Sequence, residues 1–487
     1  MMRNPIFVSL MVVIILPASF GNAGEDKQPP KPDTPQPPLI RLAAQATAKP
    51  STALRYRLLP DPLDMTPGNA APLWLQAVLA ERGKAQKIEM EEYKWSDRSE
   101  MPLKNLPRPT IKAFLARHAT ALRLARQAAH REYCDWQRPA LTFQNMQDNF
   151  SLPGVQGLRE IAFLLSVECR YQIAEQCFDE AIETLQTGLA LARHVGQGDT
   201  LIQSLVGIAI AHIMLGRIEE WMQIPGSPNL YWPLTALPQP LLDVRHSTEH
   251  EMNDIYRLFP QLRELQKETL STGEVDRLIG KLFRALDAFA GSKDRGAPTV
   301  TRKLGIAILT AKVYPEARKQ LLEQGRPAKE VDAMPMAQVA LMYFLNDYDR
   351  IRDGMLKWMT LPSWQALPGL VTAEKDARTA SRKIGNPLVS VMMPALGKIF
   401  IAKVRLELNI ASLRGGEALR LHAAAHEGQP PAKWSDLTIV PLPLDPYTGK
   451  GFDTYYQVKD GRALLIVPPP PGQSPLLSRR FELAASR

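Results

Sequence analysis

Apolar residues recur every three or four positions through most of this chain, with polar residues between them, which is the pattern of amphipathic helices. One such stripe begins near Ala70 and includes Leu73, Leu75, Val78 and Leu79. The same spacing predicts further helices at 109–131, 157–173, 178–193, 200–221, 241–259, 273–290, 300–324, 333–359, 371–383 and 388–427. We therefore expect a mostly α-helical fold.

The segment 200–221 is apolar on nearly every side, which is typical of a helix buried within a bundle. Before it, the corner from Glu175 to Ala181, followed by Leu185, resembles one tetratricopeptide unit, although Gln172 and Gly188 replace the usual residues. No second copy follows at a period of about 34 residues. The pattern predicts one hairpin of this type within a multi-helix bundle or a solenoid-like array.

Strand signals are nearly confined to the C-terminal part of the chain. The segments 454–459 and 462–467 flank Asp460-Gly461, a dipeptide whose two positions tolerate the positive φ of a tight hairpin turn. The long helix and this hairpin together predict a small C-terminal α+β module over 388–467. Its apolar hairpin is expected to dock on the long helix near His422 and His426, and to cover them.

The N-terminus has the three parts of a secretory signal peptide. Arg3 precedes an apolar run from Ile6 to Leu16, and the small residues Gly21 and Ala23 follow at plausible cleavage positions. The alternative is an uncleaved membrane anchor, but the run is shorter than the ~18 residues that span a bilayer. We expect export to the periplasm or the extracellular space, with no transmembrane helix after signal removal.

These features predict five parts along the chain. A signal peptide occupies 1–23, and a Pro-rich disordered linker follows at 24–52. The helical body spans 53–387, and the long helix with its hairpin spans 388–467. A Pro-rich and then polar mobile tail is expected over 468–487.

Composition and charge narrow the possible partners. The chain has 487 residues and a net charge of +9, but its basic residues are scattered and no run of five Lys or Arg occurs. This distribution does not favour a nucleic-acid site. The three cysteines, Cys134, Cys169 and Cys177, allow at most one disulfide and leave at least one thiol over.

One motif has the spacing of a zinc site. His246, Glu249 and His250 form H-x-x-E-H, in which two histidines four residues apart share a helix face. Glu323 lies near the separation of a third ligand without matching it. The core stripe of this helix is on the opposite side, so we interpret the motif as a surface feature, with a metal site as the alternative. The stripe comprises Leu241, Val244, Thr248, Met252, Ile255 and Phe259.

His422 and His426 form a second pair with this spacing. We interpret them as partly buried histidines whose mutual repulsion lowers one pKa, with metal binding as the alternative. The chain has no G-x-S-x-G elbow, phosphate loop or dinucleotide fingerprint, so no catalytic residue and no cofactor are expected. Adjacent carboxylates such as Glu219 and Glu220 diverge on a helix and are expected to be solvated.

Several short motifs, in this order, resemble a family of uncharacterised secreted helical proteins of planctomycete bacteria. They are Arg57-Leu58-Leu59-Pro60, Pro67-Gly68-Asn69-Ala70-Ala71, Cys134-Asp135-Trp136, Leu205-Val206-Gly207-Ile208-Ala209, Asn229-Leu230-Tyr231-Trp232, Ala333-Met334-Pro335 and Leu444-Asp445-Pro446-Tyr447-Thr448-Gly449-Lys450. The resemblance implies export and a helical architecture, and no activity. The C-terminal module is also similar to the heads of type II secretion pseudopilins, but Pro468 to Pro471 stand in place of their calcium-binding loop.

These observations favour an exported noncatalytic helical scaffold that binds a protein, a peptide or an envelope polymer. Two alternatives remain open. One is a metal-dependent hydrolase that uses a histidine pair, and the other is an accessory protein of a secretion system.

Overall fold

A computed structural model describes residues 37–44, 55–82, 88–137, 155–289, 299–392 and 394–484. The fold is mostly α-helical with a small C-terminal α+β part, as predicted. The chain divides into two compact units. The first comprises Met1–Trp136, Pro153–Val244 and Lys398–Arg487, and the second comprises Gln137–Leu152 and Arg245–Gly397. This division differs from the expected single helical body over 53–387, and the expected signal peptide lies outside the described residues.

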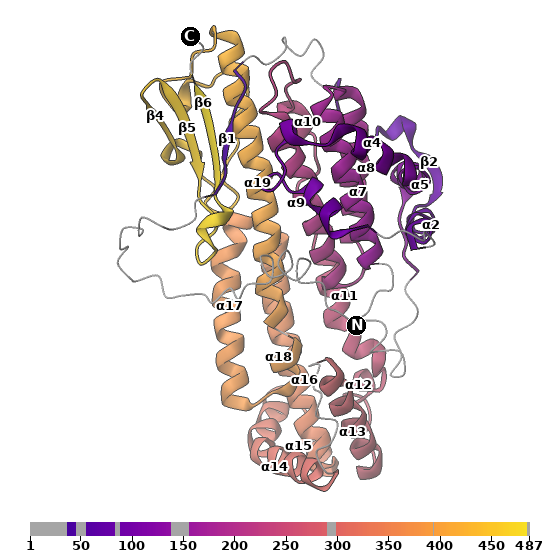
Figure 1. Cartoon of the computed structure of the whole chain (residues 1–487). Helices are drawn as coiled ribbons and strands as arrows, with labels where there is room; N and C mark the ends of the chain where they lie inside the picture. The colour runs from indigo at the N-terminus through magenta and orange to yellow at the C-terminus, as the bar shows by residue number, and fades with distance from the viewer. Residues whose placement is uncertain are drawn as a thin grey trace. The chain divides into compact units, whose positions relative to one another are not determined.

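The first unit is built around three long consecutive helices, α7, α8 and α9, and the later helix α19 (Figure 1). Its helices are α2 (Ala71–Arg82), α3 (Met90–Tyr93), α4 (Arg108–Arg117), α5 (Ala119–Ala129), α7 (Val155–Ala174), α8 (Phe178–Gly196), α9 (Leu201–Trp221), α10 (Tyr231–Thr235) and most of α19 (Pro394–Ala425). Short 3-10 helices lie at Pro62–Asp64, Lys94–Ser96, Leu103–Asn105, Trp434–Asp436, Asp453–Tyr455 and Pro475–Leu477.

Helix α9 begins with a capping box. The Thr200 hydroxyl accepts from the Gln203 amide at 3.1 Å, and the Gln203 side chain accepts from the Thr200 amide at 3.2 Å. By length and composition α9 could cross a membrane, but 67% of its most apolar window is buried inside the structure. It packs against α7 and α8, as predicted for a helix that is apolar on all sides.

The first unit also contains a four-stranded sheet. Its strand order is β1-β6-β5-β4, and Figure 1 shows it beside α19. The predicted hairpin is confirmed: β4 (Tyr456–Lys459) pairs antiparallel with β5 (Arg462–Val467). Asp460 and Gly461 form the turn with φ values of 51° and 72°, the left-handed conformation that this dipeptide favours.

Two strands of this sheet come from segments in which no strand was predicted. β6 (Arg479–Ala484) pairs antiparallel with β5, and its Phe481 and Leu483 are fully buried. The prediction of a mobile tail is therefore wrong for this segment. β1 (Leu39–Arg41) pairs parallel with β6, so the prediction of a disordered linker is wrong for these three residues. A small parallel pair, β2 (Thr66–Asn69) with β3 (Arg131–Tyr133), was also not predicted.

Two adjacent glycines let the sheet approach α19 closely. A Cβ atom at Gly415 would lie 3.1 Å from Leu465 Cδ2, and one at Gly416 would lie 3.2 Å from Phe481 Cδ1. The predicted docking of the hairpin on the long helix is thus confirmed. The predicted covering is wrong for His426, which is exposed, while His422 is buried.

The second unit is an arrangement of helices around α16, which packs against α11, α13, α14, α17 and α18. Tyr348 of α16 is fully buried and its hydroxyl donates to the Met252 carbonyl at 2.7 Å. The helices are α11 (Arg245–Leu258), α12 (Gln261–Glu264), α13 (Thr272–Phe289), α14 (Thr299–Glu323), α15 (Ala328–Ala333), α16 (Met336–Leu356), the 3-10 helix Lys357–Thr360, α17 (Ser363–Ile384) and α18 (Pro387–Met392).

Candidate functional site

The H-x-x-E-H residues lie along the outer side of α11. His246 and Glu249 are exposed, and the His250 side chain keeps 15% of its surface exposed. The two rings are 5.8 Å apart, and His250 contacts the Arg257 guanidinium. Within the described ranges no group of three or more His, Cys, Asp or Glu could hold a metal ion. The predicted core stripe of this helix, from Leu241 to Phe259, is buried.

The second histidine pair stacks at the C-terminal end of α19. The rings of His422 and His426 are parallel within 13°, with centroids 3.9 Å apart. Burial and the neighbouring His426 ring lower the pKa of His422. The predicted lowering of one pKa in this pair is therefore confirmed.

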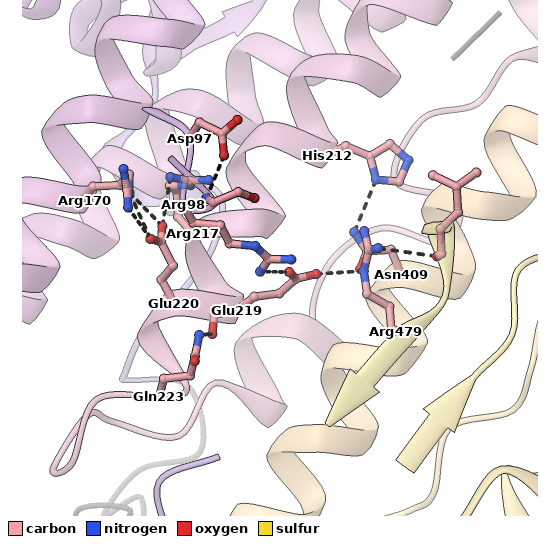
Figure 2. Close-up of polar contacts among 12 residues, drawn as sticks. Asp97, Arg98, Arg170, His212, Arg217, Glu219, Glu220, Gln223, Asn409 and Arg479 are labelled. Atoms are coloured by element: carbon pink, nitrogen blue, oxygen red, sulfur yellow. Dashed lines mark hydrogen bonds and ion pairs between the residues drawn. The ribbon is translucent and has the colours of Figure 1, made fainter. Parts of the chain in front are cut away.

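Glu219 and Glu220 are both buried at the end of α9, so the prediction that they are solvated is wrong. Arginines from distant parts of the chain surround them, as Figure 2 shows. The carboxylates point in different directions, as expected for adjacent residues of a helix, and each contacts a different set of arginines. The error arises because the partners of these carboxylates are brought in by tertiary structure.

Arg170 of α7 holds Glu220. Its Nε lies 2.9 and 3.0 Å from the two carboxylate oxygens, and its Nη2 lies 2.7 Å from Oε1. The same guanidinium donates to the Trp95 and Met101 carbonyls. Arg217, one turn before Glu220 on α9, forms a second ion pair with it at 2.8 Å. This bidentate arrangement gives the buried charges the hydrogen bonds that they need in a medium of low dielectric constant.

Glu219 forms ion pairs with two arginines that lie far apart in the sequence. Arg98 pairs with its Oε2, and Arg479 of β6 lies with Nε 2.7 Å from Oε1. Burial disfavours the charged form of Glu219, but Arg479 and Arg98 more than offset it and hold the pKa of this carboxyl below its ordinary value. The carboxylate is thus charged and links β6 to α9.

The contacts continue from Arg479 to a histidine. Arg479 Nε also lies 3.1 Å from Asn409 Oδ1, and Asn409 Nδ2 lies 3.2 Å from His212 Nδ1. Because the amide oxygen accepts from an arginine, the amide nitrogen must donate to the histidine. His212 is therefore a neutral imidazole with its proton on Nε2. These residues line a small cavity of about 30 Å³ together with Arg405 and the segment around Pro468.

The second unit has a larger polar pocket, with a volume of about 330 Å³. Tyr256 stands at its centre: its hydroxyl donates to Asp349 Oδ1 at 2.7 Å, and Arg352 Nη1 lies 2.7 Å from the same oxygen. The guanidinium carbons of Arg263 and Arg352 lie 5.7 and 5.9 Å from the Tyr256 ring centroid. The lining residues are Asn253, Tyr256, Leu262, Arg263, Gln266, Leu345, Asp349 and Arg352.

Two groups of this pocket have raised pKa values. Burial and the bond to Asp349 raise the pKa of Tyr256, so its hydroxyl stays a hydrogen-bond donor. Burial raises the pKa of Asp349, while Tyr256 and Arg352 oppose that change. The arrangement presents guanidinium and amide groups to a ligand and keeps the tyrosine in place.

The cysteines are thiols. Cys134, Cys169 and Cys177 are each unpaired with another cysteine. Burial raises the pKa of Cys134 to about 12 and also raises that of Cys169, which is fully buried. Neither group has the thiolate character of a catalytic nucleophile.

Comparison with known proteins yields no relative. No family model matches the chain, no curated protein matches it, and no solved structure matches it. The resemblances described under Sequence analysis therefore stay predictions, and a functional conclusion has to rest on the geometry of the two units.

The residues of the arginine network and of the pocket around Tyr256 were not singled out from the sequence, apart from Glu219 and Glu220. One local signal was available: Asp349 and Arg352 are three apart on a predicted helix, which places them on one face. Tyr256 lies on another helix, 93 residues from Asp349 along the chain, so no spacing rule connects it to them. Arg479 lies in a segment interpreted as a tail.

Proposed function

We propose that this chain is an exported noncatalytic binding protein of the cell envelope, and that the pocket around Tyr256, Asp349 and Arg352 receives its ligand. The pocket carries this proposal because its volume of about 330 Å³ falls within the range of small-ligand sites. Its polar groups converge from two packed helices, α11 and α16, and from the segment around α12.

The chemistry of the lining favours binding over reaction. The eight lining residues include no Ser, Thr, Cys, His or Lys. The one carboxylate, Asp349, is held by Tyr256 and Arg352. Hydrolytic chemistry commonly needs an acid–base pair or an activated nucleophile, and Asp349 is the one carboxylate among the eight lining residues.

A peptide fits this lining best. Arg263 supplies a charge for a carboxylate, Gln266 Oε1 supplies an acceptor for a peptide N–H, and Leu262 and Leu345 supply apolar surface. A sugar that stacks on Tyr256 fits less well, because two guanidinium groups already lie within 6 Å of that ring's centroid.

A peptide array probed with the labelled full chain tests this proposal. We expect binding to a subset of peptides that carry a free carboxylate, and loss of that binding in Arg263→Ala. The matched control is Arg277→Ala on α13, whose side chain is exposed and bonds only within its own helix, to the Gly273 carbonyl. Equal binding by both variants, or no peptide bound by the parent chain, would contradict the proposal.

A further inference from the structure

The buried charge network of the first unit contains more arginine than carboxylate. Two glutamates, Glu219 and Glu220, share four arginines. The arginines are Arg98, Arg170, Arg217 and Arg479. Asp97 adds a third carboxylate that acts on Arg170. Because each guanidinium stays protonated, the four arginines still exceed the three carboxylates, and the network keeps an excess of positive charge.

A fifth arginine adds to this excess at the cavity of about 30 Å³. Arg405 of α19 lines that cavity with Arg479, and among the described residues it makes no ion pair with a carboxylate. The one charged neighbour that shifts the pKa of Arg405 is Arg479, which adds to the effect of burial and lowers it. Two like charges held at one partly open cavity attract an anion from solvent.

The other polar groups of the cavity do not supply the missing negative charge. Asn409 is neutral, and His212 is a neutral imidazole that accepts from it. Burial, Arg405 and Arg479 hold the pKa of His212 well below its ordinary value. The remaining lining is apolar or proline, from Leu408 and Val467 to Leu477, with Ser412 as the one hydroxyl.

We propose that this cavity binds one oxyanion group, a phosphate or a sulfate, between Arg405 and Arg479. The enclosed volume of about 30 Å³ has room for about one oxygen of the anion, and the other oxygens would occupy the open mouth. Arginine is suited to this role because its planar fork matches two oxygens of a phosphate. This site is independent of the peptide pocket proposed above.

Arg479 is the first residue of β6, so an anion bound to it would link the last strand of the sheet to α19. Two kinds of molecule could supply this oxyanion group: a free inorganic ion, or a larger molecule that carries a phosphate ester.

Phosphorus NMR of inorganic phosphate with the full chain tests the site without depending on stability. We expect saturable line broadening in the parent chain and binding weaker by about tenfold or more in Arg405→Gln, the loss expected for a charged hydrogen bond. Arg405→Lys keeps the charge and should retain most of the binding. The matched control is Arg123→Gln on α5, an exposed arginine that donates to the Gln127 side chain one turn away.

Two further comparisons show which molecule supplies the oxyanion and whether binding depends on Arg405. Phosphoserine in place of inorganic phosphate distinguishes an ester, which must enter through the mouth, from a free ion. Binding of either one that is lost in Arg405→Gln and kept in Arg123→Gln supports the site. No saturable broadening with either probe, or the same loss in both glutamine variants, would overturn it. Circular dichroism of each variant, and the retention of binding by Arg405→Lys, separate loss of the site from loss of the fold.

Discussion

At the scale of the residue, Arg170 makes hydrogen bonds to three residues that no local sequence pattern connects to it. Its side chain is fully buried and makes five hydrogen bonds, three to Glu220 and two to backbone carbonyls. Removing one member of a buried pair leaves the other charge without its partner, which costs more than the pair contributes. Arg170 therefore fixes the segment of Trp95 and Met101 against α7 and α9.

The first prediction follows from this geometry. Arg170→Gln should lower the free energy of unfolding by about 3–5 kcal/mol, because Glu220 would keep only Arg217 and two buried carbonyls would lose a donor. Urea unfolding at neutral pH measures the change. The control is Arg108→Gln, which breaks the ion pair with Glu175 at 2.9 Å, where both side chains are about one-third or more exposed. That variant should lose less than about 1 kcal/mol, and equal losses would refute the prediction.

The second prediction concerns pH. Trp74 Nε1 lies 3.0 Å from His194 Nδ1, a hydrogen bond that requires an unprotonated acceptor. Burial, with Arg193 beside it, lowers the pKa of His194 from 6.5 to about 4. The unfolded chain takes up this proton at a higher pH than the folded chain. The stabilisation is complete above pH 6.5, is lost as the pH falls from 6.5 towards 4, and amounts to roughly 3 kcal/mol.

His194→Gln isolates this effect, since glutamine can accept from Trp74 and does not titrate. Chemical unfolding of both chains at pH 7 and pH 4.5 should show a smaller drop in stability for the variant. The difference between the two drops measures the contribution of His194, because other titrating groups are common to both chains. An identical drop in both would contradict the assigned protonation state.

At this scale the sequence predicted the burial and pKa of residues whose environment comes from one helix face. It did not predict the environment of residues whose partners come from distant segments. The buried stripe of α11 and the lowered pKa of His422 both follow from positions three or four apart. Glu219 was expected in water because nothing near it in the sequence indicates Arg98 or Arg479, whose positions depend on the folded chain. The arginine-lined cavity was not predictable for the same reason.

At the scale of the element, glycines decide how closely two helices of the first unit approach. A Cβ atom at Gly207 of α9 would lie 2.5 Å from the Cα atom of Gly196 on α8 and 2.6 Å from the Ala192 carbonyl oxygen. Both contacts are with backbone, which cannot move aside as a side chain can. At Gly216, nine residues later on α9, the Cβ position faces open space: beyond the adjacent residues and backbone of its own helix, no atom lies within 4 Å.

The third prediction compares these two glycines. Gly216→Ala should stabilise the chain by up to about 1 kcal/mol, because alanine favours a helix more than glycine does. Gly207→Ala should instead destabilise it by about 1–3 kcal/mol through overpacking against α8. Thermal unfolding of the two variants beside the parent chain checks both signs. If both substitutions stabilised the chain, α8 and α9 would not approach as closely as the structure shows.

Whether an element was predicted depends on how far apart in the sequence its interacting residues lie. Helices such as α8, α9 and α16 were predicted, because their apolar spacing is complete within each segment. The hairpin of β4 and β5 was predicted because its turn is local. Strands β1 and β6 were missed because Ile40 of β1 pairs with Phe481 of β6, 441 residues later in the chain. The two strands have only 3 and 6 residues and each follows a proline-containing segment, so nothing nearby signals a strand.

At the scale of the whole molecule, three separate stretches of the chain build the first unit: 1–136, 153–244 and 398–487. The last stretch supplies both α19 and three of the four strands beside it. Its Phe452, Leu465 and Phe481 are fully buried, and Leu465 and Phe481 lie close to the glycines of α19. The C-terminal module is therefore part of the core of this unit.

The last prediction tests this architecture by truncation after Gly428. The shortened chain would lose the sheet that covers α19 and would lose Arg479, one of the two arginines that neutralise Glu219. Burial of each large apolar side chain contributes about 1.5–3 kcal/mol, and the stability of a whole protein is only about 5–15 kcal/mol. We expect a clearly lower unfolding temperature by calorimetry, or no cooperative transition of the first unit.

A chain that stops after Pro471 serves as the intermediate case, because it keeps the hairpin of β4 and β5 and lacks β6. It should fall between the parent and the shorter chain, since it retains Phe452 and Leu465 and loses Phe481 and Arg479. The excised segment 429–484 should be unfolded by circular dichroism, because an isolated sheet of this size lacks the helix on which it packs. An unchanged midpoint in the truncated chain, with the excised segment folded, would mean that the module is an independent domain. Loss of structure in both pieces would instead show that α19 and the sheet stabilise one another, which is what the close approach at Gly415 and Gly416 predicts.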